Sequence, residues 1–357
     1  MKNNIQKIRE SNFELLRIIA MFLVLVVHAD YLSIGRPTQI EIMQEPICSI
    51  GRIFIQAMSI ACVNIFVLIS GWFGIKPSLK SFSNFIFQCL FFYIGIYWIG
   101  IASGYATFNI KDCVRSFALI KWNWFIYSYI LLYILAPVLN SYINNTPQKQ
   151  LRNTIIYFYI FQTIFGFLFR TVPFFYEGYS TISFIGLYML ARYVKLYPNK
   201  YTTFSIKKDF LIILSSIILV ATTEFLLVIN NAPKHFNYNN YINPLVIISA
   251  LYTLLAFSKL KFNNKFINWI ATSCFAVYLI HINPLILDKY LDGMKYIYNN
   301  TNGIAYLTTI TFVLILIFTI SILIDKSRIF VWNLLWKNIE KSNIYQTNFS
   351  SKNKPSQ

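Results

Sequence analysis

Ionisable side chains inside long apolar runs are the residues of this sequence best suited to chemistry. Such groups are costly in hydrocarbon, so they usually face a protein interior or a wet cavity. Two of the three histidines belong to this class. The full set of candidates is Glu14, Arg17, His28, Asp30, Glu224 and His281.

Arg17 and His28 form the most informative pair. They are eleven positions apart, so both leave one face of a helix, with an axial offset of about 16 Å. Glu14 lies one turn from Arg17 and is placed to orient it. A guanidinium at the mouth of a site can hold phosphate, and a deeper imidazole can accept a proton near neutral pH. The competing interpretation is structural, with Arg17 reaching the interface and His28 packing through a hydrogen bond.

A second polar region runs from Asn64 to Trp72 and contains the small pair Ser70 and Gly71. Small residues allow close helix approach, and Asn64 offers hydrogen bonds within the span. Lys76 and Lys80 follow this region. They are interpreted either as charges for a bound anion or simply as markers of orientation.

A third polar region surrounds His281, which is followed by Asn283 and Pro284. Pro284 is expected to kink the helix and to free a carbonyl beside His281. The competing interpretation is an interfacial histidine at a helix end. Glu224 has three possible placements, which are pairing with His281, pairing with Arg36, or facing the outer surface.

These side chains require membrane-spanning helices to position them. The 357 residues are 57% hydrophobic and only 12% charged, about half the charge of soluble proteins. This composition excludes a soluble globule and a disordered chain, and it predicts an all-α polytopic membrane protein with about ten spans. The predicted spans are 13–34, 50–74, 82–103, 122–143, 152–169, 179–196, 210–230, 241–257, 266–287 and 303–324.

Charge distribution predicts the orientation. The net charge is +18, and 21 of the 31 Lys and Arg residues lie on the side of the N-terminus, against nine on the other side. The positive-inside rule therefore places both termini in the cytoplasm. A signal peptide cleaved near Ala29 is disfavoured because nine more spans follow. We expect a transmembrane domain over 1–325 and a cytoplasmic tail over 326–357.

Several function classes lose support. Nucleic-acid binding is disfavoured because no basic run is long enough. The five scattered cysteines have no zinc spacing, so no metal is expected. Serine hydrolase, P-loop and zincin motifs are absent from the sequence.

Four segments, in order, resemble the signatures of the acyltransferase-3 family of integral membrane acyltransferases. The hallmark of its first helix is a basic residue, ten further residues and then a histidine, and Arg17 and His28 match it. The segment from Asn64 to Trp72 resembles the signature that ends in Ser-Gly-aromatic. The segment from Lys121-Trp122-Asn123-Trp124-Phe125 to Ala136-Pro137 resembles its fourth helix, and Phe275 to His281 resembles its Tyr-Leu-x-His pattern. The similarity covers about Asn12 to Ile324. One departure is Lys76-Pro77-Ser78-Leu79-Lys80, where many members carry Arg-x-x-Arg.

The resemblance implies transfer of an acyl group, usually acetyl from cytoplasmic acetyl-CoA, to a hydroxyl of a cell-surface polysaccharide or its lipid-linked precursor. Acetyl-CoA then acts as a co-substrate, and no cofactor is bound permanently. We expect Arg17, with Lys76 and Lys80, to hold the donor phosphates. We expect His28 to act as general base or to carry the acyl group, with Glu14, Ser70 and His281 in support.

Three alternatives remain open. A transporter or flippase of lipid-linked sugars also buries ionisable residues at mid-membrane, although the sequence has no internal repeat. A glycan polymerase would need larger loops than these. An enzyme of the same chemistry could use succinyl-CoA, and no residue distinguishes the two donors.

Overall fold

The computed structural model describes residues 9–117, 124–232 and 238–341. It is 79% helical, and no strand occurs in those three ranges. Lys121, Trp122 and Asn123 of the fourth-helix motif lie outside the described residues. The predicted all-α class is confirmed.

Six helical segments of the described chain are long and apolar enough to cross a membrane. Their outward faces carry exposed apolar side chains, such as Leu211, Leu219 and Phe312. This arrangement suits lipid rather than water, and the chain is an all-α polytopic membrane protein. The segments are α1 (Ser11–Val27) with the π-helical turn η1 (His28–Leu32), α3 (Pro46–Ser59) with α4 (Cys62–Phe73), α5 (Leu79–Ala102), α7 (Trp124–Asn145), α10 (Ile206–Ile229) and α15 (Gly303–Lys341).

The remaining helices are shorter, and four of the ten predicted spans fall on them. Range 152–169 forms α8 and a π-helical turn, 179–196 forms α9, 241–257 forms α11, and 266–287 is divided between α12 and α13. The bounds are α2 (Gln39–Gln44), α6 (Ile110–Phe117), α8 (Gln148–Phe161), η2 (Gln162–Leu168), η3 (Tyr176–Gly178), α9 (Thr181–Leu196), α11 (Pro244–Ser258), α12 (Lys265–Ala271), α13 (Cys274–His281) and α14 (Leu287–Asn300).

The expected kink at Pro284 is replaced by a complete break. Helix α13 ends at His281, and the amides of Ile286 and Leu287 both donate to the carbonyl of Asn283 at 2.8 Å. A turn therefore follows His281 before α14 begins. The Asn283 amide bonds the Ile280 carbonyl at 3.2 Å, so that carbonyl is satisfied within the turn.

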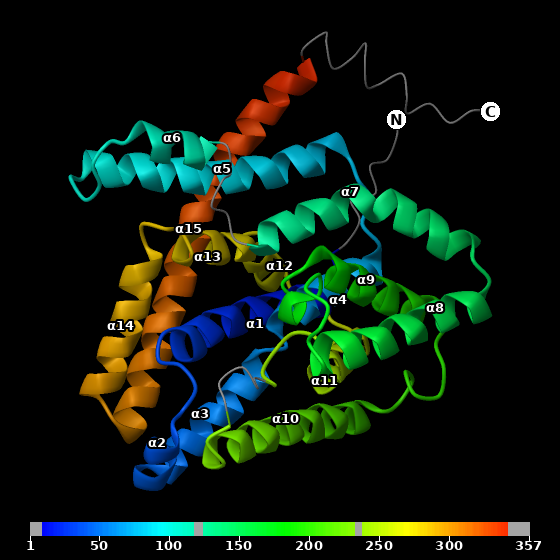
Figure 1. The fold of residues 1–357 in the computed structure, drawn as a ribbon. Helices are drawn as coiled ribbons and strands as arrows, with labels where there is room; N and C mark the ends of the chain where they lie inside the picture. The colour runs from blue at the N-terminus through cyan, green and yellow to red at the C-terminus, as the bar shows by residue number, and fades with distance from the viewer. Residues whose placement is uncertain (1–8, 118–123, 233–237, 342–357) are drawn as a thin grey trace, which may run out of the picture.

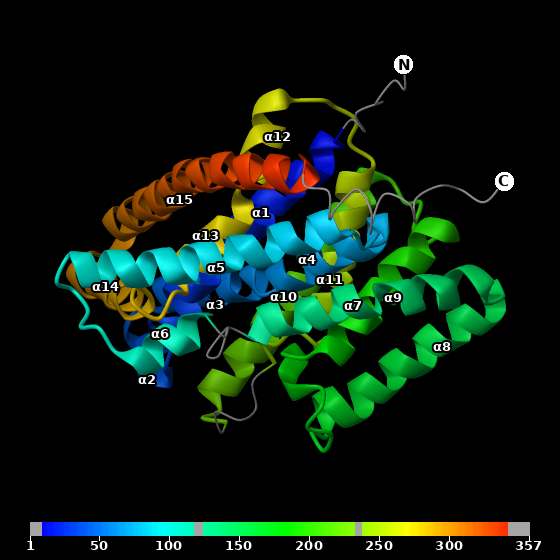
Figure 2. The same ribbon diagram turned by 90° about the horizontal axis from the view of Figure 1, so that it is seen from above.

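Helix α1 runs through the middle of the molecule, between α14 and α15 on one side and α7, α8 and α9 on the other (Figure 1). Helix α15 crosses α5 at a steep angle (Figure 1), and the two run one above the other when seen from above (Figure 2). Helix α4 packs closely on both α1 and α9. A Cβ atom added at Gly71 would lie 2.4 Å from the Tyr188 carbonyl oxygen. The predicted close helix approach at Gly71 is therefore confirmed.

A buried ionic cluster fixes the C-terminal end of α1. Asp30, in the π-helical turn, accepts from Arg52 Nε at 3.0 Å and also from Gln56. Arg52 further lies 3.6 Å from the carboxylate of Glu41, outside the spans. Burial alone would raise the pKa of Glu41, but hydrogen bonds from Thr38 and the charge of Arg52 lower it. The cluster joins α1, α2 and α3.

Two further predictions concern charged residues at the edges of the spans. Glu224 pairs with Arg36 at 3.6 Å and accepts hydrogen bonds from the amides of Tyr238 and Asn239. Of its three predicted placements, pairing with Arg36 is therefore the one observed. Helix α15 continues past Ile324 to Lys341, with the Asp325–Arg328 ion pair buried against α5. The cytoplasmic location of the tail 326–357 stays a prediction.

Candidate active site

His28 and His281 meet in the centre of the protein. Nδ1 of His28 lies 2.7 Å from Nε2 of His281, although the two residues are 253 positions apart in sequence. His28 stands where α1 passes into its π-helical turn, and His281 is the last residue of α13. The side chain of His281 is fully buried, so the interfacial interpretation of this residue is wrong.

The hydrogen bonds of this pair determine which nitrogen of His28 can react. Nδ1 of His281 lies 2.6 Å from the carbonyl oxygen of Val277. A carbonyl only accepts, so this nitrogen carries the proton of the neutral ring. Nε2 of His281 is then an acceptor, and Nδ1 of His28 must be the donor to it. The remaining nitrogen, Nε2 of His28, consequently bears a lone pair and is the basic atom of the pair.

That basic nitrogen belongs to a residue lining a cavity of about 230 Å³ between α1, α4 and α7. The wall opposite α1 is aromatic and includes Trp124, Phe125, Tyr179 and Tyr278. Such a wall excludes water while leaving a few hydroxyl groups for orientation. The cavity can hold a reacting carbonyl and hydroxyl beside the imidazole.

Arg17 lies at the opposite end of the same helix face, as predicted. Its guanidinium is 6.0 Å from the ring centre of Phe73 on α4, whereas Cys62 and Val63 of α4 line the cavity of His28. Both side chains therefore face α4, which runs antiparallel to α1. Nη1 of Arg17 is 2.5 Å from a carboxylate oxygen of Glu14, so the predicted orienting contact is confirmed. Arg17 is not among the residues lining the cavity of His28.

Ser70 lies on α4 between Val63, which lines the cavity of His28, and Phe73, which faces Arg17. Its hydroxyl is 3.2 Å from the hydroxyl of Tyr129, whose ring stacks on Phe125 with a centroid distance of 5.9 Å. Phe125 in turn lines the cavity of His28. Ser70 is thus linked through Tyr129 and Phe125 to the cavity of His28.

The two predicted lysines occupy different surroundings. Lys80 pairs with Glu340 at 3.3 Å and lies over the ring of Trp336, both on α15. Both side chains of this ion pair are about half exposed, and the expected donor role of Lys80 stays a prediction. Lys76 is exposed on the loop after α4, where the Tyr188 hydroxyl accepts the Ile75 amide at 2.9 Å. Lys76 is thus the better placed of the two lysines for an anion at the Arg17 end.

Two further cations, on α9, extend the positive surface near Arg17. Nζ of Lys195 lies 4.9 Å from the ring centre of Phe73, and a Cβ atom at Gly74 would be 3.5 Å from the guanidinium of Arg192. In the sequence, Arg192 and Lys195 contribute only to the charge asymmetry that predicts the orientation. Their i, i+3 spacing puts them on one helix face, but nothing in the sequence links that face to α4.

Comparison with known protein families agrees with this geometry. The family model for the acyltransferase domain of the acyltransferase-3 family matches residues 10–326. Searches of curated proteins and of solved structures gave no significant match. Because the match covers nearly the whole chain, this protein belongs to the acyltransferase-3 family and is a membrane acyltransferase.

Proposed function

We propose that this acyltransferase moves an acetyl group from cytoplasmic acetyl-CoA to a hydroxyl of a cell-surface polysaccharide or of its lipid-linked precursor. The observation that carries the proposal is the His281–His28 pair, which leaves Nε2 of His28 basic on a residue that lines an aromatic cavity. Proton-coupled transporters also use buried ionisable groups, so the family match over residues 10–326, together with this pair, favours the enzyme. The protein acts in the cell membrane with both termini cytoplasmic, consistent with the distribution of Lys and Arg.

The donor enters from the Arg17 end in this proposal. Arg17, Arg192 and Lys195 surround Phe73 and Gly74, and Lys76 lies on the loop that follows. Guanidinium groups hold phosphate oxygens in a bidentate manner, and ammonium groups act as point charges. The nucleotide phosphates stay at this mouth while the thioester arm extends along Ser70 and Tyr129 toward His28. Lys80 pairs with Glu340 on α15, so its contribution in this proposal is secondary to that of Arg17 and Lys76.

His28 acts as general base in the transfer step. Nε2 of His28 takes the proton of the acceptor hydroxyl as that oxygen attacks the thioester carbonyl carbon. The carbon–sulfur bond then breaks, and the imidazolium returns its proton to the departing thiolate. General-base assistance of this kind typically contributes about 10²–10⁴-fold to the rate. The scheme needs no permanently bound cofactor.

Transfer of radiolabelled acetyl groups from acetyl-CoA to polysaccharide tests the proposal. Membranes from cells with and without the chain are compared, using envelope polysaccharide freed of esters by mild alkali as acceptor. We expect label in the polysaccharide only when the chain is present, and succinyl-CoA is run in parallel as the competing donor. Label that stays on the protein in the absence of acceptor would indicate a covalent acetyl-enzyme intermediate instead of direct transfer. A flippase would give no transfer from either donor.

A further inference from the structure

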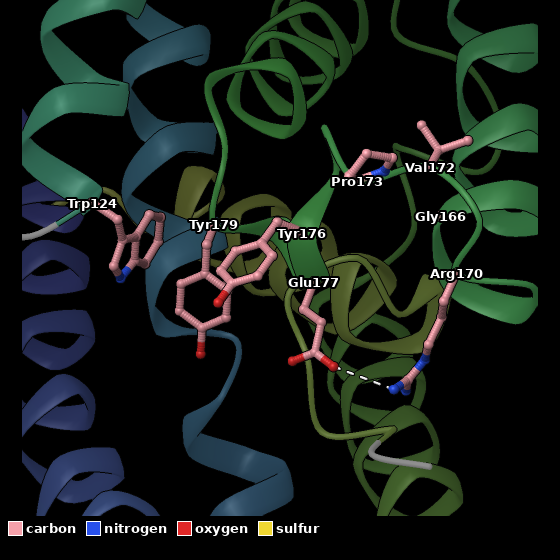
Figure 3. Close-up of a pocket in the computed structure, with 8 residues that line it drawn as sticks. All are labelled: Trp124, Gly166, Arg170, Val172, Pro173, Tyr176, Glu177 and Tyr179. Carbon is pink, nitrogen blue, oxygen red and sulfur yellow. Dashed lines mark hydrogen bonds and ion pairs between the residues drawn. The ribbon is translucent and has the colours of Figure 1, made fainter. Parts of the chain in front are cut away.

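A second cavity adjoins that of His28 on the side away from Arg17. It has a volume of about 670 Å³ and lies under the segment between α8 and α9 (Figure 3). Trp124, Tyr176 and Tyr179 present their rings to it, and Arg170 and Glu177 form an ion pair of 3.3 Å at its edge. Trp124 and Tyr179 also line the cavity of His28, so the two cavities share a wall.

The backbone of this segment is built to hold its side chains in place. Tyr176, Glu177 and Gly178 are three consecutive residues with positive φ, a conformation that is costly for non-glycine residues. A Cβ atom at Gly178 would lie 2.5 Å from Cβ of Tyr241, so only glycine fits there. The amide of Tyr241 donates to the carbonyl of Glu177 at 3.1 Å. The loop around Tyr241 therefore holds the segment in this unusual conformation.

Tyr241 also connects the segment to the catalytic helices. Its carbonyl accepts a hydrogen bond from the Asn64 side chain of α4 at 2.9 Å. Its ring contacts those of Tyr179 and Trp124, with centroid distances of 5.1 and 5.7 Å. The shared wall is thus positioned from α4, the same helix that faces Arg17 and His28.

The groups around this second cavity match the chemistry of a sugar ring. A pyranose has apolar C–H faces that pack on aromatic rings, and a rim of hydroxyls that hydrogen-bond to paired donors and acceptors. Tyr176 and Trp124 supply rings, whereas the Arg170–Glu177 pair supplies donors and acceptors with little net charge. A nucleotide phosphate would meet the carboxylate of Glu177, and a lipid chain would meet both charges. The cavity therefore favours a neutral polar ring.

We propose that this cavity binds a glycosyl unit of the acceptor and directs a neighbouring hydroxyl past Trp124 and Tyr179 to His28. The inference rests on the proposed function, because it assigns the acceptor side of the same reaction. It places the donor and acceptor sites at opposite ends of the α1 face that carries Arg17 and His28.

Steady-state kinetics with two substrates tests this assignment. The donor is acetyl-CoA, and the acceptor is envelope polysaccharide freed of esters by mild alkali. Glu177→Gln keeps the shape of the side chain but removes a charged acceptor, and Tyr176→Ala removes a ring. We expect each variant to raise KM for the polysaccharide about fivefold to tenfold, with KM for acetyl-CoA unchanged. Tyr296→Ala is the matched control. Tyr296 is 69% exposed, nearly the same as Tyr176 at 70%, and it lines neither cavity.

Binding of the same polysaccharide to purified protein in lipid nanodiscs, without donor, separates this inference from the proposed function. Binding by the wild type that weakens in both variants, with no acetyl transfer, would refute the proposed function and support the sugar site. The sugar site would be overturned if the wild type transfers acetyl groups normally while Glu177→Gln and Tyr176→Ala have the same KM and the same polysaccharide binding as Tyr296→Ala. Absence of both binding and transfer in the wild type would overturn both.

Discussion

Replacement of His281 tests how the reactive nitrogen of His28 is oriented. In the protein, Nε2 of His281 accepts the proton on Nδ1 of His28 at 2.7 Å, and Val277 holds the His281 ring through its other nitrogen. His281→Leu removes the acceptor and leaves a buried N–H without a partner. Either this N–H remains unpaired or His28 turns, and in both cases Nε2 is no longer held as the base.

The size of the effect follows from that lost hydrogen bond. A buried polar group left unpaired costs about 1–3 kcal/mol, which corresponds to about 5- to 150-fold in rate. We expect kcat for acetyl transfer to fall by this factor in His281→Leu, while KM for acetyl-CoA stays near the wild-type value because Arg17 is untouched. The assay is transfer of labelled acetyl groups to polysaccharide, normalised to the amount of protein in the membrane.

His281→Gln is the matched variant, because a glutamine side-chain oxygen can occupy the place of Nε2 and accept the same proton. It should retain most of the activity that His281→Leu loses. Wild-type kcat in His281→Leu would show that His28 needs no partner. Equal loss in both variants would show that His281 contributes more than an acceptor.

Three further predictions address the donor end, the packing and the pH response. Arg192→Ala and Lys195→Ala should each raise KM for acetyl-CoA about tenfold with kcat retained, and a donor saturation curve with unchanged KM would remove these residues from the site. Gly71→Ala should lower the Tm of the detergent-solubilised protein, because the added Cβ atom would lie 2.4 Å from the Tyr188 carbonyl oxygen. Overpacking of this kind costs about 1–3 kcal/mol of stability. An unchanged Tm would contradict the close contact. The pKa of Glu41 is lowered by folding, so its contribution to stability is present above its unfolded pKa and is lost as pH falls through the folded value. On acidification, the Tm of the wild-type protein should therefore fall by more than the Tm of Glu41→Gln. Equal falls in Tm for the two proteins would contradict this.

Hydrophobicity predicted the long helices because lipid-facing segments must be apolar over their whole length. Range 82–103 and range 210–230 coincide with α5 and α10 within a few residues. The range 266–287 was predicted as one span but forms two short helices, α12 and α13. The cause is tertiary, since α12 and α13 pack against α1 and α15 and so need not span the hydrocarbon alone. An apolar run does not reveal whether its neighbours are lipid or protein.

The candidate site was predictable where one helix determines it. The shared face of Arg17 and His28 follows from helix geometry alone, and the structure reproduces it. The contact between His28 and His281 joins residues 253 positions apart, and only the packing of α13 on α1 creates it. Arg192 and Lys195 on α9 and the Arg170–Glu177 pair were missed for the same reason, because their neighbours come from distant parts of the chain.

The central claim is that His28 performs the chemistry, and mass spectrometry of the surface glycans from cells that express His28→Ala tests it most directly. General-base loss predicts a fall in transfer of about 10²–10⁴-fold, so O-acetyl groups on the glycan should disappear while the variant remains in the membrane at wild-type levels. Glycans with an unchanged acetyl content in those cells would contradict the assignment of His28.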